Sequence, residues 1–138
     1  MNIHSVPADA SPMTERILDA ALAVFTERTF GGAAVPLIAE RAGVSVGSLY
    51  RSFSGKEEMA NAVYRRAKTR MLAAVTEAVA DAGPEAGTQG AVLAAWAGLA
   101  AYAAADPDGF AFLEHQQHAA YLDDESRAVA RRIDDLAA

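Results

Sequence analysis

The sequence predicts an all-α fold. Hydrophobic residues make up 52% of the 138 residues, and alanine, the strongest helix former, is prominent among them. Between positions 35 and 42 the apolar residues recur three and four apart, as they do on one face of a helix. Glycine and proline interrupt the helical stretches at a few places, notably Gly31-Gly32, Gly43 and Gly83-Pro84. We therefore expect helices joined by short turns.

The first helix is expected to begin at Ser11-Pro12. Serine is a preferred N-cap, and proline is tolerated at the first helical position. Ile17, Ala21 and Phe25 then share one face, which predicts a buried side. Phe30-Gly31-Gly32 should break this helix.

Two short helices are expected on either side of Gly43. Residues 35–42 form the first, and Gly43 provides the residue that tolerates positive φ at a helix end. Ser45 is a good N-cap for the second, whose Leu49 and Phe53 lie four apart on one face. Helix, glycine turn and helix in this order is the layout of a helix-turn-helix.

A long helix is expected from this point to about Ala82. Ser54-Gly55-Lys56-Glu57 matches the capping box S-x-x-E, in which the glutamate reaches back to the cap. Lys56 would stand in the first turn, where the helix dipole disfavours a cation. A bound phosphate would explain a lysine there, and the alternative is an incidental surface lysine.

The second half of the chain begins after the linker Gly83-Pro84-Glu85-Ala86-Gly87. Residues 86–105 carry no charge, so a membrane-spanning helix has to be considered. Their Ala- and Gly-rich composition and the lack of flanking Lys or Arg favour an interior helix of a small all-α domain. Asp106-Pro107 should open another helix that reaches about Tyr121. The acidic residues 123–125 are expected in the first turn of a final helix, where the helix dipole favours negative charge.

The net charge of −6 is unevenly distributed. Residues 1–70 hold 9 Lys/Arg and 7 Asp/Glu, whereas residues 71–138 hold 3 and 11. A basic end on an acidic body is typical of proteins that turn one end toward nucleic acid. The alternative is that the basic residues after the third helix form an ordinary solvated face. These are Arg65, Arg66, Lys68 and Arg70.

The pattern IAERAGVS-x-G-x-LYR-x-F over residues 38–53 resembles the DNA-binding domain of TetR-type transcriptional regulators. The resemblance extends upstream through Glu15-Arg16-Ile17-Leu18-Asp19-Ala20-Ala21 and Phe25, and downstream through Lys56-Glu57. It implies a three-helix head, a long fourth helix and a small, shortened helical half for effector binding and dimerisation. The expected domains are residues 11–71 and 72–138.

The resemblance also implies the partners. They are a double-stranded DNA operator, an unknown small-molecule effector and a second copy of the chain, in the cytoplasm and with no cofactor or membrane. In this family the first residues of the third helix meet base edges. The tyrosine of that helix and the residues that follow the tyrosine touch phosphates. Carried over by position, the DNA-binding residues are Ser45, Val46, Gly47, Ser48, Tyr50, Arg51, Ser52 and Lys56.

The chain departs from the family pattern in several places. Thr29 stands where relatives usually carry glycine, and Ala33 or Ala34 where they carry a Thr or Ser helix cap. Val46 stands where relatives often have Lys and Ser52 where they often have His, so we expect a shallower salt dependence of DNA binding. Relatives also continue with two more helices that form a dimer interface, so we expect weaker dimerisation.

Aromatic residues gather in the second half of the chain. They predict an apolar effector pocket with a few polar groups, and the alternative is a plain core. The pocket residues would be Met71, Trp96, Tyr102, Phe110, His115, His118 and Tyr121.

Glu114, His115 and His118 are the candidates for a metal site. Histidines three apart can share a helix face, but no further ligand is placed by spacing, so we expect no metal. No nucleophile turn, phosphate-cradling loop or recognisable carboxylate pair indicates catalysis, and we expect no enzyme.

Two hypotheses follow. The leading one is a ligand-responsive, sequence-specific regulator, a repressor that binds a palindromic operator as a dimer. The competing one is a shortened helical interaction module, which pairs with another regulator chain or binds DNA only weakly.

Overall fold

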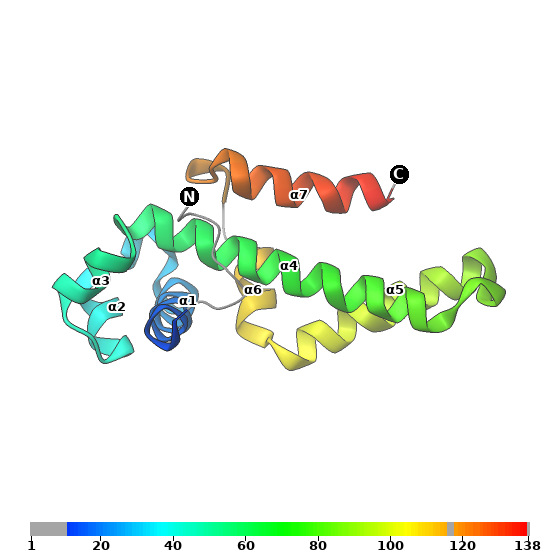
Figure 1. Ribbon diagram of the computed structural model, residues 1–138, viewed down its shortest axis with the longest axis horizontal. Helices are drawn as coiled ribbons and strands as arrows, with labels where there is room; N and C mark the ends of the chain where they lie inside the picture. Colours follow the sequence, from blue (N-terminus) through cyan, green and yellow to red (C-terminus); the bar gives the residue numbers. More distant parts are fainter. Residues whose placement is uncertain (1–10, 116–117, 138) are drawn as a thin grey trace. The chain divides into compact units, whose positions relative to one another are not determined.

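The computed structural model describes residues 11–115 and 118–137 (Figure 1). Within these ranges the chain forms helices and turns and no strand, which confirms the all-α prediction. The chain divides into two compact units, residues 1–60 and 61–138, and the division falls inside the long helix α4 (Lys56–Ala82). The predicted boundary between functional domains after residue 71 stays a prediction.

The first unit contains α1 (Pro12–Gly32), α2 (Val35–Ala42), α3 (Val46–Ser52) and the start of α4. Ser11 caps α1 as predicted, because its hydroxyl accepts a hydrogen bond from the Thr14 backbone N–H at 3.2 Å. The apolar faces of these helices form the core of the unit. Its fully buried side chains include Ile17, Leu18, Val24, Phe25, Ile38, Leu49 and Met59.

The break in α1 lies at Thr29. Its φ of 62° and ψ of 171° are not helical, whereas Phe30, Gly31 and Gly32 complete the last turn before Ala33. The prediction that Phe30-Gly31-Gly32 breaks the helix was therefore wrong by one residue. The conformation at Thr29 is one that glycine adopts far more easily than threonine, so the backbone is strained there.

The turn between α2 and α3 is fixed by backbone hydrogen bonds. Gly43 has φ 70° and ψ 32°, the left-handed conformation that the sequence predicted for it. The Gly43 N–H donates to the Glu40 carbonyl at 3.1 Å, and the Val44 N–H donates to the Ala39 carbonyl at 3.0 Å. These two bonds form a Schellman motif, which satisfies the last carbonyls of α2 and turns the chain into α3.

The start of α4 differs in detail from the predicted capping box. The Ser54 backbone N–H donates to the Glu58 carboxylate at 2.7 Å. The reach-back contact thus comes from Glu58, whereas the S-x-x-E pattern pointed to Glu57. The reason is that α4 begins at Lys56, so that Glu58 is the third helical residue.

The second unit contains the rest of α4, the 3-10 turn η1 (Pro84–Ala86) and α5 (Gly87–Ala105). Gly98 lies at the contact of these two helices, since a Cβ atom added there would stand 2.6 Å from the Ala74 carbonyl oxygen. A side chain at position 98 would therefore push α5 away from α4. Among the described helices, none is long and apolar enough to cross a membrane.

The chain continues with α6 (Pro107–His115), the 3-10 turn η2 (His118–Ala120) and α7 (Asp124–Ala137). Asp106 caps α6 as expected, because its carboxylate accepts from the Gly109 N–H at 3.0 Å. The prediction that this helix reaches Tyr121 was wrong. It ends at His115, and the separate turn η2 allows the His118 ring to lie between aromatic side chains.

Candidate nucleic-acid interface

The start of α3 is organised by two serines. The Ser45 hydroxyl oxygen accepts from the Ser48 backbone N–H at 3.1 Å, and the Ser45 hydroxyl donates to the Ser48 hydroxyl at 2.9 Å. Ser45 is therefore the N-cap that the sequence predicted. Because the Ser48 oxygen accepts from Ser45, the Ser48 hydroxyl keeps its own hydrogen for a base or a phosphate.

One face of α3 is open to solvent. Val46 is 41% exposed and Tyr50 is 50% exposed, which is unusual for side chains of this size and apolar character. Ser45, Gly47 and Arg51 are exposed as well, while Leu49 is completely buried. Five of the residues predicted to meet DNA are thus open to solvent on a helix that Leu49 anchors in the core, and Ser48 is half-buried. Ser52 is half-buried.

Gly47 lies in open surroundings on this face. A Cβ atom added there would meet nothing closer than the Ser45 hydroxyl oxygen, at 4.0 Å. The fold of the unit therefore does not require glycine at this position. A glycine at the start of α3 allows the helix backbone to come close to a groove.

Lys56 stands at the first position of α4, next to Phe30. Its ammonium nitrogen lies 4.5 Å from the centre of the Phe30 ring, which is a cation–π contact. The Phe30 ring in turn lies 5.9 Å from the ring of the buried Phe25. The lysine that was predicted to bind a phosphate is thus held at the amino end of α4.

Arg41 is used inside the first unit. Its guanidinium makes two hydrogen bonds to the Glu27 carboxylate, at 2.9 and 3.0 Å, which tie α2 to α1. The hydrogen bond from Arg41 lowers the pKa of Glu27 below its usual value. The Arg41 guanidinium is therefore paired with Glu27. Within the first unit, Arg51 and Lys56 are the basic residues on and after α3.

The basic residues that follow position 60 belong to the second unit. Residues 1–60 contain 5 Lys/Arg and 7 Asp/Glu, and residues 61–138 contain 7 and 11. The first unit is thus not basic as a whole. Electrostatic attraction to phosphates would come from a few residues around α3 rather than from a broad field.

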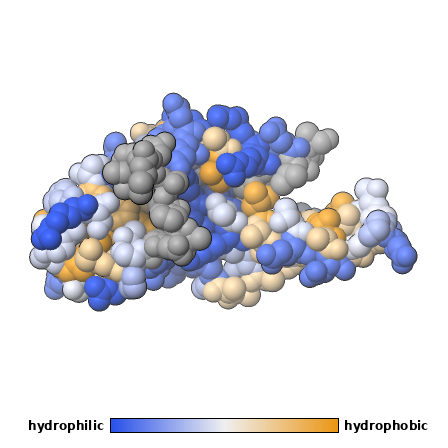
Figure 2. Space-filling view, viewed as in Figure 1, coloured by the Kyte–Doolittle hydropathy of each residue, from blue (hydrophilic) through white to orange (hydrophobic). Residues whose placement is uncertain are grey.

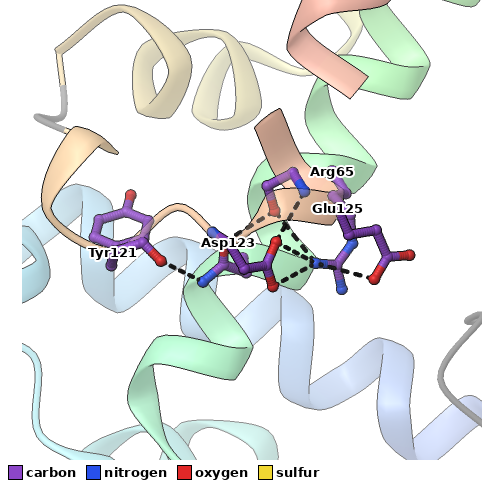
Figure 3. A network of polar contacts seen from close by, with 6 residues as sticks. Arg65, Tyr121, Asp123 and Glu125 are labelled. Atoms are coloured by element: carbon purple, nitrogen blue, oxygen red, sulfur yellow. Dashed lines mark hydrogen bonds and ion pairs between the residues drawn. The ribbon is translucent and has the colours of Figure 1, made fainter. Parts of the chain in front are cut away.

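Arg65 belongs to a network of hydrogen bonds and ion pairs in the second unit (Figure 3). Its guanidinium lies 3.2 Å from the Asp123 carboxylate and 3.8 Å from that of Glu125. It also donates to the Ser126 hydroxyl at 3.2 Å. Arg65 therefore fits neither the prediction of a basic end turned toward nucleic acid nor that of an ordinary solvated face.

Asn61 is the buried centre of the same network and was missed by the sequence analysis. Its amide donates to the Tyr121 carbonyl at 2.8 Å, and its oxygen accepts from the Asp123 N–H at 2.8 Å and the Ser126 hydroxyl at 2.9 Å. Asn61 is 3% exposed. The available signal was a single amide among the inward-facing apolar residues of a long helix.

The residues predicted to form an effector pocket fall into separate places in the second unit. His118 and Tyr121 hydrogen-bond to each other, and the His118 ring contacts the rings of Tyr64 and Phe112. Trp96 instead lines an open groove. Met71 and Phe110 are half-buried, Tyr102 is buried and His115 is exposed. The pocket stays a prediction.

The groove beside Trp96 is entirely apolar. Its volume is about 240 Å³, and its lining residues are Val75, Val92, Ala95, Trp96 and Leu99. In Figure 2, hydrophobic residues reach the surface over the part of the chain where Figure 1 places α4 and α5.

His115 and His118, the histidines considered as metal ligands, lie on different elements. Because α6 ends at His115 and η2 begins at His118, the two histidines do not share a helix face as their spacing suggested. Among the residues that the structure describes, no three His, Cys, Asp or Glu side chains come together as metal ligands would.

Comparison with known proteins identifies the first unit. Residues 17–63 match the family described as bacterial regulatory proteins, tetR family. The chain is 32% identical to the HTH-type transcriptional regulator UidR of Escherichia coli K12 over 77 residues, which are 56% of this chain and 39% of UidR. It is 43% identical to SrpR of Pseudomonas putida over 56 residues, 41% of this chain and 26% of SrpR. The chain thus matches well under two thirds of the length of these relatives.

Solved structures agree with the fold. A tetR family transcription regulator from Shewanella sp. PV-4 superimposes with a TM-score of 0.77 and 22% identity, over 91% of this chain and 68% of that one. The regulator PfmR from Thermus thermophilus gives a TM-score of 0.72 and 26% identity, over 87% of this chain and 62% of that one. Residues 17–63 of the chain are thus a helix-turn-helix domain of the tetR family of bacterial regulatory proteins.

Proposed function

We propose that this chain is a sequence-specific DNA-binding transcriptional repressor that acts in the cytoplasm and responds to a small-molecule effector. The observation that carries the proposal is the outer face of α3. Ser45, Gly47 and Tyr50 are exposed there, on a helix whose Leu49 is fully buried. A short helix that is rigidly anchored on one side and open on the other suits entry into a major groove.

The mechanism requires two copies of the chain. Two recognition helices would bind half-sites one helical turn apart, about 34–36 Å, on a palindromic operator. An effector bound in the second unit would favour a state in which both heads no longer fit the two half-sites. It can do so only if it binds that state more tightly than the DNA-bound state.

The test is fluorescence anisotropy with labelled duplex DNA from upstream of the chain's own coding sequence. Protein is titrated over a series of salt concentrations and against random competitor DNA. We expect saturable binding that survives competitor, with two chains per site. Binding that salt and competitor abolish would reduce the first unit to a non-specific electrostatic contact and contradict the proposal.

Gly47→Glu provides the matching variant. A carboxylate on the outer face of α3 should abolish operator binding by repulsion from the phosphates, while circular dichroism shows unchanged helix content. Gly47→Ala is the control, because a methyl group has room at this position. Retained affinity in Gly47→Glu would contradict the assignment of this face to DNA.

A second candidate function rests on the groove in the second unit. Trp96 is 67% exposed, Leu93 64% and Val92 51%, an apolar surface of the kind that mediates protein contacts. The chain would then be an interaction module that pairs with another regulator chain. A monomer in solution at micromolar concentration, with only weak DNA binding, would favour this alternative.

A further inference from the structure

We propose that Phe30 is a positioning residue for DNA binding, which acts by holding the Lys56 ammonium group where it meets a phosphate. The inference rests on the proposed function, since it concerns how the first unit holds DNA. It adds a residue that lies outside α3 and outside the set predicted from the sequence.

The first observation is the contact itself. The Lys56 ammonium nitrogen lies 4.5 Å from the centre of the Phe30 ring, and Lys56 is half-buried although lysine is usually exposed. A lysine side chain has four flexible carbon atoms, so a free one samples many positions. The ring reduces this freedom before DNA arrives.

The second observation is the support of the ring. Phe30 lies 5.9 Å from the ring of Phe25, which is fully buried in the core. The residue before Phe30 is Thr29, whose non-helical backbone conformation kinks α1 at this point. Phe30 is thus fixed from one side by the core and from the other by the bend of its own backbone.

The third observation is the place of Lys56 in α4. It is the first residue of a helix of 27 residues, where the helix dipole repels a cation. Without a compensating partner, the ammonium group would turn toward solvent. The electron-rich face of the Phe30 ring offsets that repulsion, so the charge stays beside the start of α4.

A double-mutant cycle tests this role. Phe30→Leu keeps an apolar side chain and removes the ring face, Phe30→Tyr keeps the ring, and Lys56→Met keeps the stem and removes the charge. We expect Phe30→Leu to weaken operator binding about two- to five-fold and Phe30→Tyr to bind like the wild type. Lys56→Met should lower the slope of log affinity against log salt by about 0.9.

The decisive comparison is Phe30→Leu in the Lys56→Met background, where it should cause no further loss. Loss of the same size with and without Lys56 would overturn the inference, and so would unchanged affinity of Phe30→Leu beside the wild type. In both cases the proposed function stands. If the wild type shows no competitor-resistant binding, the proposed function fails and the positioning role with it.

A measurement without DNA tests the contact between Phe30 and Lys56 directly, and circular dichroism detects a variant that fails to fold. In the folded wild type, the ring current of Phe30 should move the Lys56 ε-methylene protons upfield in the NMR spectrum, and Phe30→Leu should remove this shift. An ordinary shift in the wild type would overturn the proposed contact. Should Phe30→Leu fail to fold, as seen by circular dichroism, Phe30→Met takes its place in the cycle.

Discussion

At the scale of single residues, strain at one position coincides with a departure from the family pattern. Thr29 is the non-glycine residue with positive φ in the described ranges, at φ 62° and ψ 171°. This region of backbone space is almost exclusive to glycine, and other residues adopt it at a cost of about 1–3 kcal/mol. The surrounding core, with Phe25 and Phe30 in contact, holds the bend in spite of that cost.

Thr29→Gly should therefore stabilise the protein. We expect a gain of about 1 kcal/mol in the free energy of unfolding, because relief of strain exceeds the greater flexibility of glycine in the unfolded chain. Urea denaturation followed by circular dichroism measures it. Thr29→Ala is the control, since alanine keeps the Cβ atom that causes the strain, and a similar gain in that variant would contradict the explanation.

At the scale of elements, the start of α7 is attached to α4 by polar side chains. Asn61 and Arg65 on α4 meet Asp123 and Ser126 at the beginning of α7, and both Asn61 and Ser126 are buried (Figure 3). Partial burial opposes ionisation of Asp123, but hydrogen bonds from Ser126 and the charge of Arg65 lower its pKa below the ordinary 3.8. Such an attachment depends on complete pairing of its polar groups.

Asn61→Ala should loosen this attachment. The change leaves the Tyr121 carbonyl, the Asp123 N–H and the Ser126 hydroxyl without the partner that the asparagine provides. We expect a loss of about 2 kcal/mol in stability and faster amide hydrogen exchange in α7. Thr69→Ala, at an exposed position of the same helix, is the control. Unchanged exchange in α7 would show that the network does not hold it.

Acid should destabilise the second unit through His118. Burial lowers the pKa of His118 below its ordinary 6.5 and Lys68 lowers it further, while the carbonyls of Leu113 and Phe112 act in the opposite direction. The unfolded chain therefore takes up a proton at a higher pH than the folded one. The contribution of neutral His118 to stability is complete above pH 6.5 and is lost as the pH falls through the lowered pKa.

Thermal unfolding between pH 8 and pH 5 checks this expectation. The wild type should lose stability below about pH 6.5, and His118→Phe should lose less over the same range. His115→Gln, which replaces an exposed histidine of the same unit, is the control. Identical pH profiles for the wild type and His118→Phe would contradict the assignment.

At the scale of the whole molecule, the chain exposes an apolar surface, which is unfavourable in water unless a partner covers it. Val92, Leu93 and Trp96 are each more than half exposed on α5, a helix without any charged residue. Such surfaces are usually covered by a partner, and aromatic side chains contribute most to that contact. The regulator that we propose needs two chains, so self-association through this surface is expected.

Trp96→Ser tests that expectation. Sedimentation should show the wild type as a species heavier than its chain mass of 14.4 kDa, with dissociation on the order of ten-fold easier in the variant. Tyr50→Ser, which removes an exposed aromatic residue of the first unit, should leave the association unchanged. A wild type that stays monomeric would direct the search to a different partner chain.

The sequence by itself determined the helices of the first unit and the polar outward face of α3. Ser11, Gly43 and Ser45 act through neighbours three to five residues away, and the hydrogen bonds of the structure confirm each of them. Local caps of this kind depend on few residues, so a short pattern is enough to predict them. The early end of α6 escaped prediction, because the local helical pattern does not show the contacts that the His118 ring makes with Tyr64 and Phe112.

Only the tertiary structure decided which side chains meet across the chain. Asn61 and Ser126 are 65 positions apart, and Phe30 and Lys56 lie on different helices. The exposure of Trp96 likewise contradicts what its size suggests, since large aromatic residues are usually well buried. Spacing along one helix defines a face, but it contains no information about the element that covers that face. That choice follows from the packing of all helices together.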